Sequence, residues 1–145
     1  VYWKRTSPHP MMTLFDAPDR ESSCVRRSRT NTPLQSLGML NETQRIEMGR
    51  RLGVRILKAA ESDSDRINYL FELLTCRDAG EREQKACSTL IKQLRRRYEM
   101  NPNDAERLLG IGEARIPSEF SPAELAAWAQ LATTVLASDV AILLY

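Results

Sequence analysis

Apolar residues recur at three- and four-residue steps along most of this chain, and that spacing is typical of amphipathic α-helices. We expect six helices, which begin at Thr32, after Asn41, after the Ser62–Asp65 cluster, after Gly80, at Pro102 and at Ser121. No run of residues alternates apolar and polar side chains at a step of two, and the sequence has no Asn-Gly or Asp-Gly hairpin turn. The pattern therefore predicts an all-α fold, an irregular bundle of about five to six helices.

The first long helix has a start signal with a physical mechanism. Thr32 is suited to cap the helix, Pro33 fits the first helical position, and Gln35 is placed to complete a capping box with Thr32. The same three-residue spacing recurs at two later helix starts, in Asn41 with Gln44 and in Ser121 with Glu124. We expect side-chain caps at all three positions.

Residues 1–31 show no helical period and are interrupted by prolines at positions 8, 10 and 18. They carry enough apolar side chains to pack on a helical body: Trp3, Met11, Met12, Leu14 and Phe15. We therefore predict a single helical domain over residues 1–145, with an extended N-terminal arm over 1–31 and a helical body over 32–145.

The length and composition are those of one globular domain, with 145 residues, 42% hydrophobic and 28% charged. The net charge of +2 conceals an asymmetry between the two parts of the chain. Residues 1–60 have eleven Lys and Arg against five Asp and Glu, a net charge of +6, whereas residues 61–145 have ten against fourteen, a net charge of −4. The N-terminal part is thus suited to contact an anion or an acidic surface, including one on the same molecule.

The cysteines and acidic residues do not have the spacing of a metal or cofactor site. Cys24, Cys76 and Cys87 are far apart and odd in number, so they predict neither a disulfide framework nor a metal site, and the apolar surroundings of Cys87 predict a buried thiol. Asp63 and Asp65 lack the glycine and closing glutamate of a calcium loop, and we expect them to cap a helix. The sequence has no haem-attachment motif, phosphate loop or dinucleotide-binding fingerprint. We therefore expect no metal and no cofactor in this chain.

The only histidine is His9, between two prolines. An imidazole titrates near neutrality and is suited to act as a general base, but no glycine-flanked serine or cysteine nucleophile accompanies it. We favour a packing or surface role for His9, and the sequence leaves open whether the chain is an enzyme.

The segment of densest polar chemistry precedes the first long helix. It contains the residues that we select as candidates for binding an anion or a partner: Arg20, Arg26, Arg27, Arg29 and Asn31. Guanidinium groups bind carboxylates, sulfates and phosphates through paired hydrogen bonds, and the N-terminus of the helix after Thr32 adds free N–H groups. Alternatively, the arginines pair with nearby carboxylates and attach the arm to the helices; the acidic residues available are Asp16, Asp19 and Glu21. We favour this second interpretation.

Nucleic-acid binding and membrane insertion are the remaining classes to consider. Arg95–Arg97 lies in the last turn of a helix, where cations interact favourably with the helix dipole, and only 6% of the residues are aromatic. We interpret these arginines as a solvated helix end and do not expect nucleic-acid binding. The apolar segment 131–145 is shorter than a membrane span and contains Asp139, so we expect no transmembrane segment.

Several motifs near the N-terminus resemble a known family. The strongest is Thr30-Asn31-Thr32-Pro33-Leu34-Gln35-Ser36-Leu37, and it is preceded by Phe15-Asp16-Ala17-Pro18, Arg20 and Arg26-Arg27. The resemblance is dense from Tyr2 to Asn41 and thin beyond it, at Arg66-Ile67, Tyr69–Phe71 and Glu124–Trp128. The chain is similar to the C-terminal domain of unknown function found in large planctomycete and verrucomicrobial proteins, often downstream of a cytochrome c-like module. The family usually has an asparagine and an acidic residue before a final aromatic, where this chain has Ser138-Asp139-Val140-Ala141.

The resemblance implies an exported, extracytoplasmic, multidomain protein, and it supplies no activity or catalytic residue. It also implies that the chain, which begins with Val1, is the C-terminal part of a larger protein with any haem in an upstream domain. We expect a non-catalytic structural or interaction module whose partners are the upstream domains of the same protein. The alternative is part of an active site, completed upstream, in which Arg20, Arg26, Arg27 and Arg29, with Asp16 and His9, line a wall for an anionic substrate such as a polysaccharide.

Overall fold

A computed structural model describes residues 8–18, 23–26, 30 and 32–142 of the chain. Within this described part the structure has eight α-helices and no strand, which confirms the predicted all-α fold. The chain divides into two compact units, residues 1–41 and residues 42–145. The predicted single domain, with an arm over residues 1–31 and a helical body over 32–145, stays a prediction.

The first unit contains two helices, α1 (Pro10–Leu14) and α2 (Pro33–Asn41), which pack against each other. The arm is therefore not extended throughout, since Pro10 starts one short helix within it. His9 caps α1: its Nδ1 accepts a hydrogen bond from the backbone N–H of Met11 at 3.3 Å. Leu14 lies so close to α2 that a Cβ at Gly38 would come within 2.6 Å of the leucine side chain.

The second unit contains the other six helices: α3 (Thr43–Ala59), α4 (Asp63–Thr75), α5 (Glu81–Met100), α6 (Pro102–Leu109), α7 (Pro122–Leu136) and α8 (Asp139–Ile142). Together with α2, five of these helices match the six predicted from the apolar spacing. The short α8 follows α7 as a separate helix. Within the described residues, no helix combines the length and the apolar character that crossing a membrane requires.

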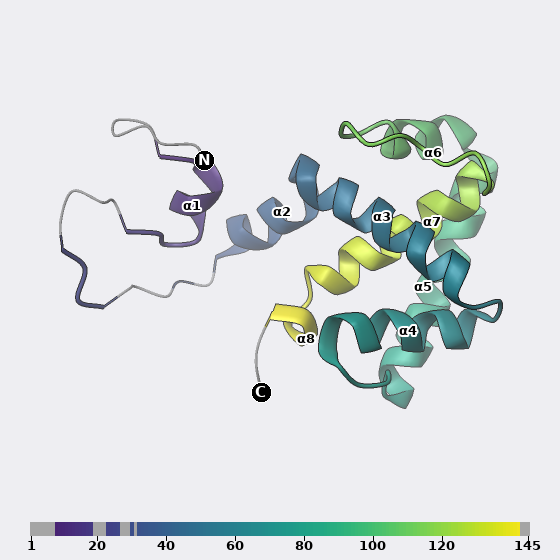
Figure 1. Cartoon of the computed structure of the whole chain (residues 1–145), viewed down its shortest axis with the longest axis horizontal. Helices are drawn as coiled ribbons and strands as arrows, with labels where there is room; N and C mark the ends of the chain where they lie inside the picture. The colour runs from purple at the N-terminus through teal and green to yellow at the C-terminus, as the bar shows by residue number, and fades with distance from the viewer. Residues whose placement is uncertain (1–7, 19–22, 27–29, 31, 143–145) are drawn as a thin grey trace. The chain divides into compact units, whose positions relative to one another are not determined.

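Helix α7 forms the centre of the second unit, where it packs against α3, α5 and α6 (Figure 1). Most of its residues are buried, and Trp128 is completely inaccessible to solvent. A helix that is apolar on nearly all sides is typical of a core position. Helix α3 crosses α7 most extensively, and this crossing depends on Gly49 and Gly53, whose Cα atoms lie against Ala129 of α7.

Two predicted helix caps are wrong. Glu42, not Asn41, caps α3, because its carboxylate accepts a hydrogen bond from the backbone N–H of Arg45 at 2.9 Å. Ser121 makes no side-chain capping bond at the start of α7. The carboxylate of Glu124 is instead bonded to side chains of other helices and to Trp128, so it is not available for a capping box.

One arginine of α3 is buried, an unusual environment for a charged side chain. Arg50 is only 3% exposed, and its guanidinium donates hydrogen bonds to the carbonyl oxygens of Leu109 and, at 2.8 Å, of Ala114. Leu109 ends α6, so the cation lies at the negative end of that helix dipole. Glu47, one turn earlier, accepts a hydrogen bond from the backbone N–H of Glu113 at 2.9 Å. Both residues fix the loop after α6 against α3.

Candidate interaction site

A compact hydrogen-bond network joins the two helices of the first unit and is built from the motif that carried the family resemblance. The carboxylate of Asp16 accepts hydrogen bonds from the backbone N–H of Thr30 at 2.8 Å and from its hydroxyl at 2.7 Å. Asp16 has a left-handed backbone with φ of 54°, a conformation that aspartate tolerates better than most residues. The turn after α1 is thus held by the backbone N–H and the hydroxyl of Thr30, 14 residues further along the chain.

Gln35 is the centre of this network. Its Oε1 accepts a hydrogen bond from the N–H of Thr32 at 3.0 Å, and its own N–H donates to the hydroxyl of Thr32 at 3.3 Å. This arrangement confirms the predicted capping box. The Gln35 Nε2 also donates to the carbonyl of Leu14 at 2.9 Å and to the hydroxyl of Thr30 at 3.1 Å. One buried side chain therefore starts α2 and joins it to the end of α1.

The opposite side of α2 presents an apolar surface to solvent. Leu34, Leu37 and Leu40 are 64%, 54% and 42% exposed, and we call these three residues the leucine face. They recur at three-residue steps, so their side chains form one stripe along the helix. Contiguous exposed apolar surface on a folded protein marks a site of interaction. The hydrogen-bond network described above holds the helix that presents this stripe.

Most of the candidate anion-binding residues lie outside the part of the chain that the structure describes. Arg20, Arg27, Arg29 and Asn31 lie outside the described residues, as do Asp19 and Glu21. Arg26 is described and exposed, and its carbonyl accepts a hydrogen bond from the Cys24 thiol. Asp16, proposed as an arginine partner, bonds to Thr30. The choice between anion binding and internal pairing for these arginines stays a prediction.

A second polar cluster, which sequence reasoning missed, lies around Trp128 in the second unit. We call it the Trp128 cluster; it consists of Asp63, Arg66, Arg95, Glu124 and Trp128. The guanidinium of Arg95 donates to the carboxylate of Glu124 through Nε at 2.7 Å and through Nη2 at 2.6 Å. Its Nη2 also donates to Asp63 at 2.7 Å. The cluster thereby joins α4, α5 and α7.

Trp128 takes part through both its ring and its N–H group. The guanidinium groups of Arg66 and Arg95 lie 5.7 and 5.9 Å from its ring centre, within cation–π range. The indole Nε1–H donates to Glu124 at 2.9 Å. The buried ring therefore has its only polar atom satisfied.

The cluster shifts the pKa of both carboxyl groups. The hydrogen bond from Arg95 is the largest influence on Asp63 and lowers its pKa, although partial burial acts in the opposite direction. Burial raises the pKa of Glu124, but the hydrogen bonds from Arg95 and Trp128 outweigh it and the net pKa is lowered. The hydrogen bonds to Glu124 and Asp63 raise the pKa of Arg95. All of these groups are charged at neutral pH and form an ion-pair network with a structural role.

This cluster corrects two interpretations made from the sequence. Arg95 is not part of a solvated helix end, since only Arg96 and Arg97 of that run are exposed. Asp63 does not serve only the start of α4, where Ser62 makes the cap by accepting from the N–H of Asp65 at 3.1 Å. A signal for the role of Arg95 was present, because it lies one turn after the buried Ile91 and borders the apolar stripe of its helix.

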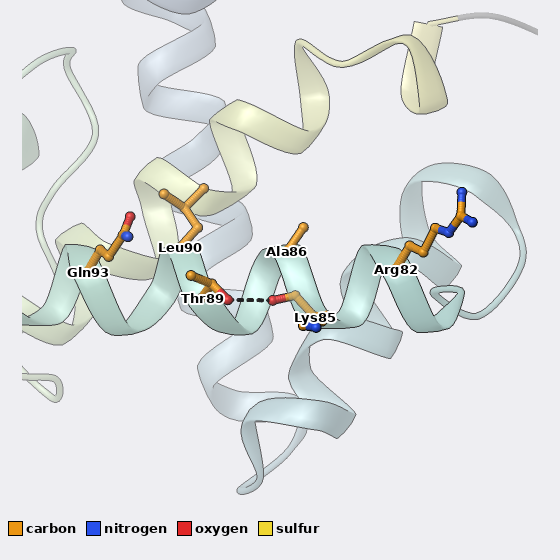
Figure 2. A pocket seen from close by; sticks show the side chains of 6 residues that line it. All are labelled: Arg82, Lys85, Ala86, Thr89, Leu90 and Gln93. Carbon is orange, nitrogen blue, oxygen red and sulfur yellow. Dashed lines mark hydrogen bonds between the residues drawn. The ribbon is translucent and has the colours of Figure 1, made fainter.

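Two hollows of the described surface are open to solvent. One of about 420 Å³ lies on α5 and is lined by that helix alone: Arg82, Lys85, Ala86, Thr89, Leu90 and Gln93 (Figure 2). The Thr89 hydroxyl donates to the carbonyl of Lys85 at 2.8 Å, marked by the dashed line in Figure 2. Another lies around the start of α6, between Met100 and Arg107.

Other reactive side chains of the described part are dispersed. No three His, Cys, Asp or Glu side chains among the described residues are close enough together to hold a metal ion. Cys87 is buried, as predicted, and burial raises the pKa of its thiol. Cys24 and Cys76 are exposed.

The chain was compared with known protein families, curated proteins and solved structures. Residues 1–91 match the family described as "PSD1: Protein of unknown function (DUF1553)". The matched region contains the Gln35 network and the leucine face. No curated protein and no solved structure matches the chain.

Proposed function

The chain belongs to the PSD1 (DUF1553) family, and from this premise we propose that it is a non-catalytic interaction module of a large exported bacterial protein. The family is typically found in planctomycete cytochrome c-associated proteins, and it carries no indicated activity. The module docks onto other parts of that larger protein. As parts of the same proposal, the larger protein lies outside the cytoplasm, and any haem lies in an upstream domain rather than in this chain. Both points rest on the family association.

The leucine face is the observation that carries this proposal. An apolar stripe more than two-fifths exposed on all three side chains costs free energy in water unless another surface covers it. Gln35 meanwhile holds the start of α2 by hydrogen bonds to Leu14 and Thr30, so the stripe is presented on a braced helix. A braced apolar helix face is suited to docking.

Thiol accessibility tests this docking. In a background with Cys24 and Cys76 changed to serine, Leu34→Cys and Leu37→Cys are labelled with a maleimide in residues 1–145 alone and in the full-length gene product. We expect labelling at least about tenfold slower in the full-length product, because a buried thiol reacts only when its cover opens.

The matched control is Ile116→Cys, in the loop between α6 and α7, which replaces another exposed apolar side chain. Its labelling rate is expected to be the same in both proteins. Equal labelling of Leu34→Cys and Leu37→Cys in the two proteins would contradict docking through this face.

The alternative function, an arginine-lined wall for an anionic polysaccharide, depends on Arg20, Arg26, Arg27 and Arg29. Three of these arginines lie outside the described residues, and the exposed Arg26 alone makes no site. No specific geometry favours this alternative over docking, and it stays a prediction.

A further inference from the structure

The outer side of α5 has an unusual distribution of charge. One stripe of the helix surface is exposed along its whole length: Arg82, Lys85, Ala86, Thr89, Lys92, Gln93, Arg96 and Met100. Four of these eight residues are cationic, and the two exposed glutamates of the helix, Glu81 and Glu99, lie at the edge of the stripe near its two ends. We call Arg82, Lys85, Lys92 and Arg96 the basic face of α5. Their positions repeat at helical steps, so the four charges follow one line over about 21 Å at 1.5 Å per residue.

The cations of the basic face are not used in internal ion pairs. The described salt bridges of α5 involve Glu83, Arg95 and Arg97, which lie at the sides of the helix. Within the described part of the chain, Arg82, Lys85, Lys92 and Arg96 form no ion pair, although Lys92 contributes to the lowered pKa of Asp63. These four cations are therefore available to an outside partner.

The centre of the basic face has the shape of a contact surface. Between the two pairs of cations lie the small side chains of Ala86 and Thr89, and Leu90 borders them at the edge of the hollow of about 420 Å³ (Figure 2). Small residues on a helix permit another backbone to approach closely, and an apolar centre between charged ends resembles the anatomy of a protein interface. An extended polyanion would gain nothing from such a centre.

We infer that the basic face of α5 docks an acidic amphipathic helix from another polypeptide segment. Glutamates or aspartates of that helix lie against Arg82 and Lys85 at one end and against Lys92 and Arg96 at the other. Its apolar side lies over Ala86, Thr89 and Leu90. A nucleic acid fits less well, because none of the outward positions of α5 is aromatic and able to stack on a base. This inference deepens the proposed function and rests on it, since it names the chemistry of one docking partner.

The test uses residues 1–145 and a fluorescein-labelled synthetic helical peptide of about 20 residues. The peptide repeats Glu, Ala and Leu so that glutamates border an apolar stripe, and binding is followed by fluorescence anisotropy. A second peptide has glutamine in place of every glutamate. We expect saturable binding of the acidic peptide and at least about tenfold weaker binding of the neutral one, because several rim charge pairs are lost.

Two variants locate the site. Lys85→Glu/Arg96→Glu reverses two charges of the basic face, and we expect the affinity for the acidic peptide to fall about thirtyfold as attraction becomes repulsion. Arg107→Glu/Arg115→Glu makes the same change in net charge at exposed arginines outside α5 and is expected to change the affinity less than about twofold. Equal losses in the two variants would overturn the inference.

A third variant tests shape independently of charge. Ala86→Trp fills the centre of the face, and we expect at least about tenfold weaker peptide binding, as for the loss of a central contact. A single-stranded DNA oligonucleotide serves as the alternative polyanion. DNA binding tighter than peptide binding and unaffected by Ala86→Trp would overturn the assignment to an acidic helix. If the peptide does not bind while Leu34→Cys and Leu37→Cys are protected in the full-length product, this inference fails and the proposed function stands.

Discussion

Arg95 of α5 and Glu124 of α7 are 29 residues apart in sequence and face each other through two hydrogen bonds, of 2.7 Å from Nε and 2.6 Å from Nη2. In this geometry two N–H groups of the planar guanidinium donate to the two oxygens of one carboxylate, which is the strong form of an arginine–carboxylate pair. The side chains are 26% and 28% exposed, so the pair is neither fully buried nor freely solvated. Because Asp63 binds the same guanidinium, one residue connects three helices.

Removal of this guanidinium is expected to destabilise the second unit. Arg95→Ala leaves Asp63 and Glu124 partly buried without their main partner and removes one cation from the ring of Trp128. We expect the free energy of unfolding to fall by about 2 kcal/mol, between the small value of an exposed pair and the 3–5 kcal/mol of a broken buried one. Urea denaturation followed by circular dichroism measures it. The neighbouring Arg96→Ala, at an exposed position, is the control and should cost less than about 0.5 kcal/mol.

The same pair predicts how stability depends on pH. Asp63 and Glu124 have lowered pKa values in the folded protein, so their stabilising contribution is complete above the ordinary carboxyl pKa and is lost as the pH falls through the folded-state pKa. The difference in unfolding free energy between the wild type and Arg95→Ala should therefore be largest near pH 6 and shrink below about pH 4. Urea denaturation at several pH values gives this difference. A difference that stays constant down to about pH 3 would show that the two carboxylates do not depend on Arg95.

Gln35 performs two tasks that one substitution separates. Gln35→Glu keeps an oxygen that can accept from the N–H of Thr32, but it lacks the amide donor for Leu14 and Thr30. We expect α2 to remain helical while the contact to α1 weakens by about 1 kcal/mol or more, since two hydrogen bonds are lost. Hydrogen exchange of the Thr30 backbone amide, bonded to Asp16, should then accelerate about fivefold or more.

The control for that experiment is Gln44→Glu, the same chemical change at an exposed position of α3. It should leave the exchange rate of the Thr30 amide unchanged. Loss of helical signal from α2 in Gln35→Glu, with no change at Thr30, would mean that Gln35 acts on the capping box alone.

Local sequence rules account for most of the helices and for the capping box at the start of α2, which is part of the candidate interaction site. The capping box of Thr32 and Gln35 needs only four consecutive residues, so its prediction depended on nothing distant. The buried face of α7 around Trp128 was likewise predictable from its three- and four-residue spacing. These features lie within one helix, where periodicity and capping chemistry are decisive.

The features that could not be predicted depend on contacts between distant segments. Asp63 and Glu124 each had a sufficient local interpretation as helix-start residues, and Arg95 had one as a helix-end cation. Their partners lie 29 and 32 residues away, so only the packing of three helices shows the pairing. Arg50 was missed for the same reason, since the carbonyls that accept its hydrogen bonds are 59 and 64 residues further along the chain.

The crossing of α3 and α7 gives the last prediction. A Cβ at Gly49 would lie 2.9 Å from the carbonyl oxygen of Ala129 and would overlap the hydroxyl of Thr133, and a Cβ at Gly53 would lie 3.0 Å from the backbone nitrogen of Ala129. Backbone atoms of a core helix cannot move aside easily, because interiors are close-packed. Gly49→Ala should therefore cost about 2–3 kcal/mol through overpacking, although alanine favours an isolated helix over glycine by about 1 kcal/mol.

Thermal unfolding measures this effect against Gly80→Ala, where the added Cβ meets only the flexible end of Glu83 at 3.4 Å. That control should leave the midpoint within a few degrees of the wild type. The opposite signs of propensity and packing make Gly49→Ala informative. A variant at least as stable as the wild type would mean that helix propensity outweighs the close approach, and that α3 and α7 are not held together at Gly49. A clear loss of stability would support direct contact between the two helix backbones at Gly49, where an added Cβ overlaps the hydroxyl of Thr133.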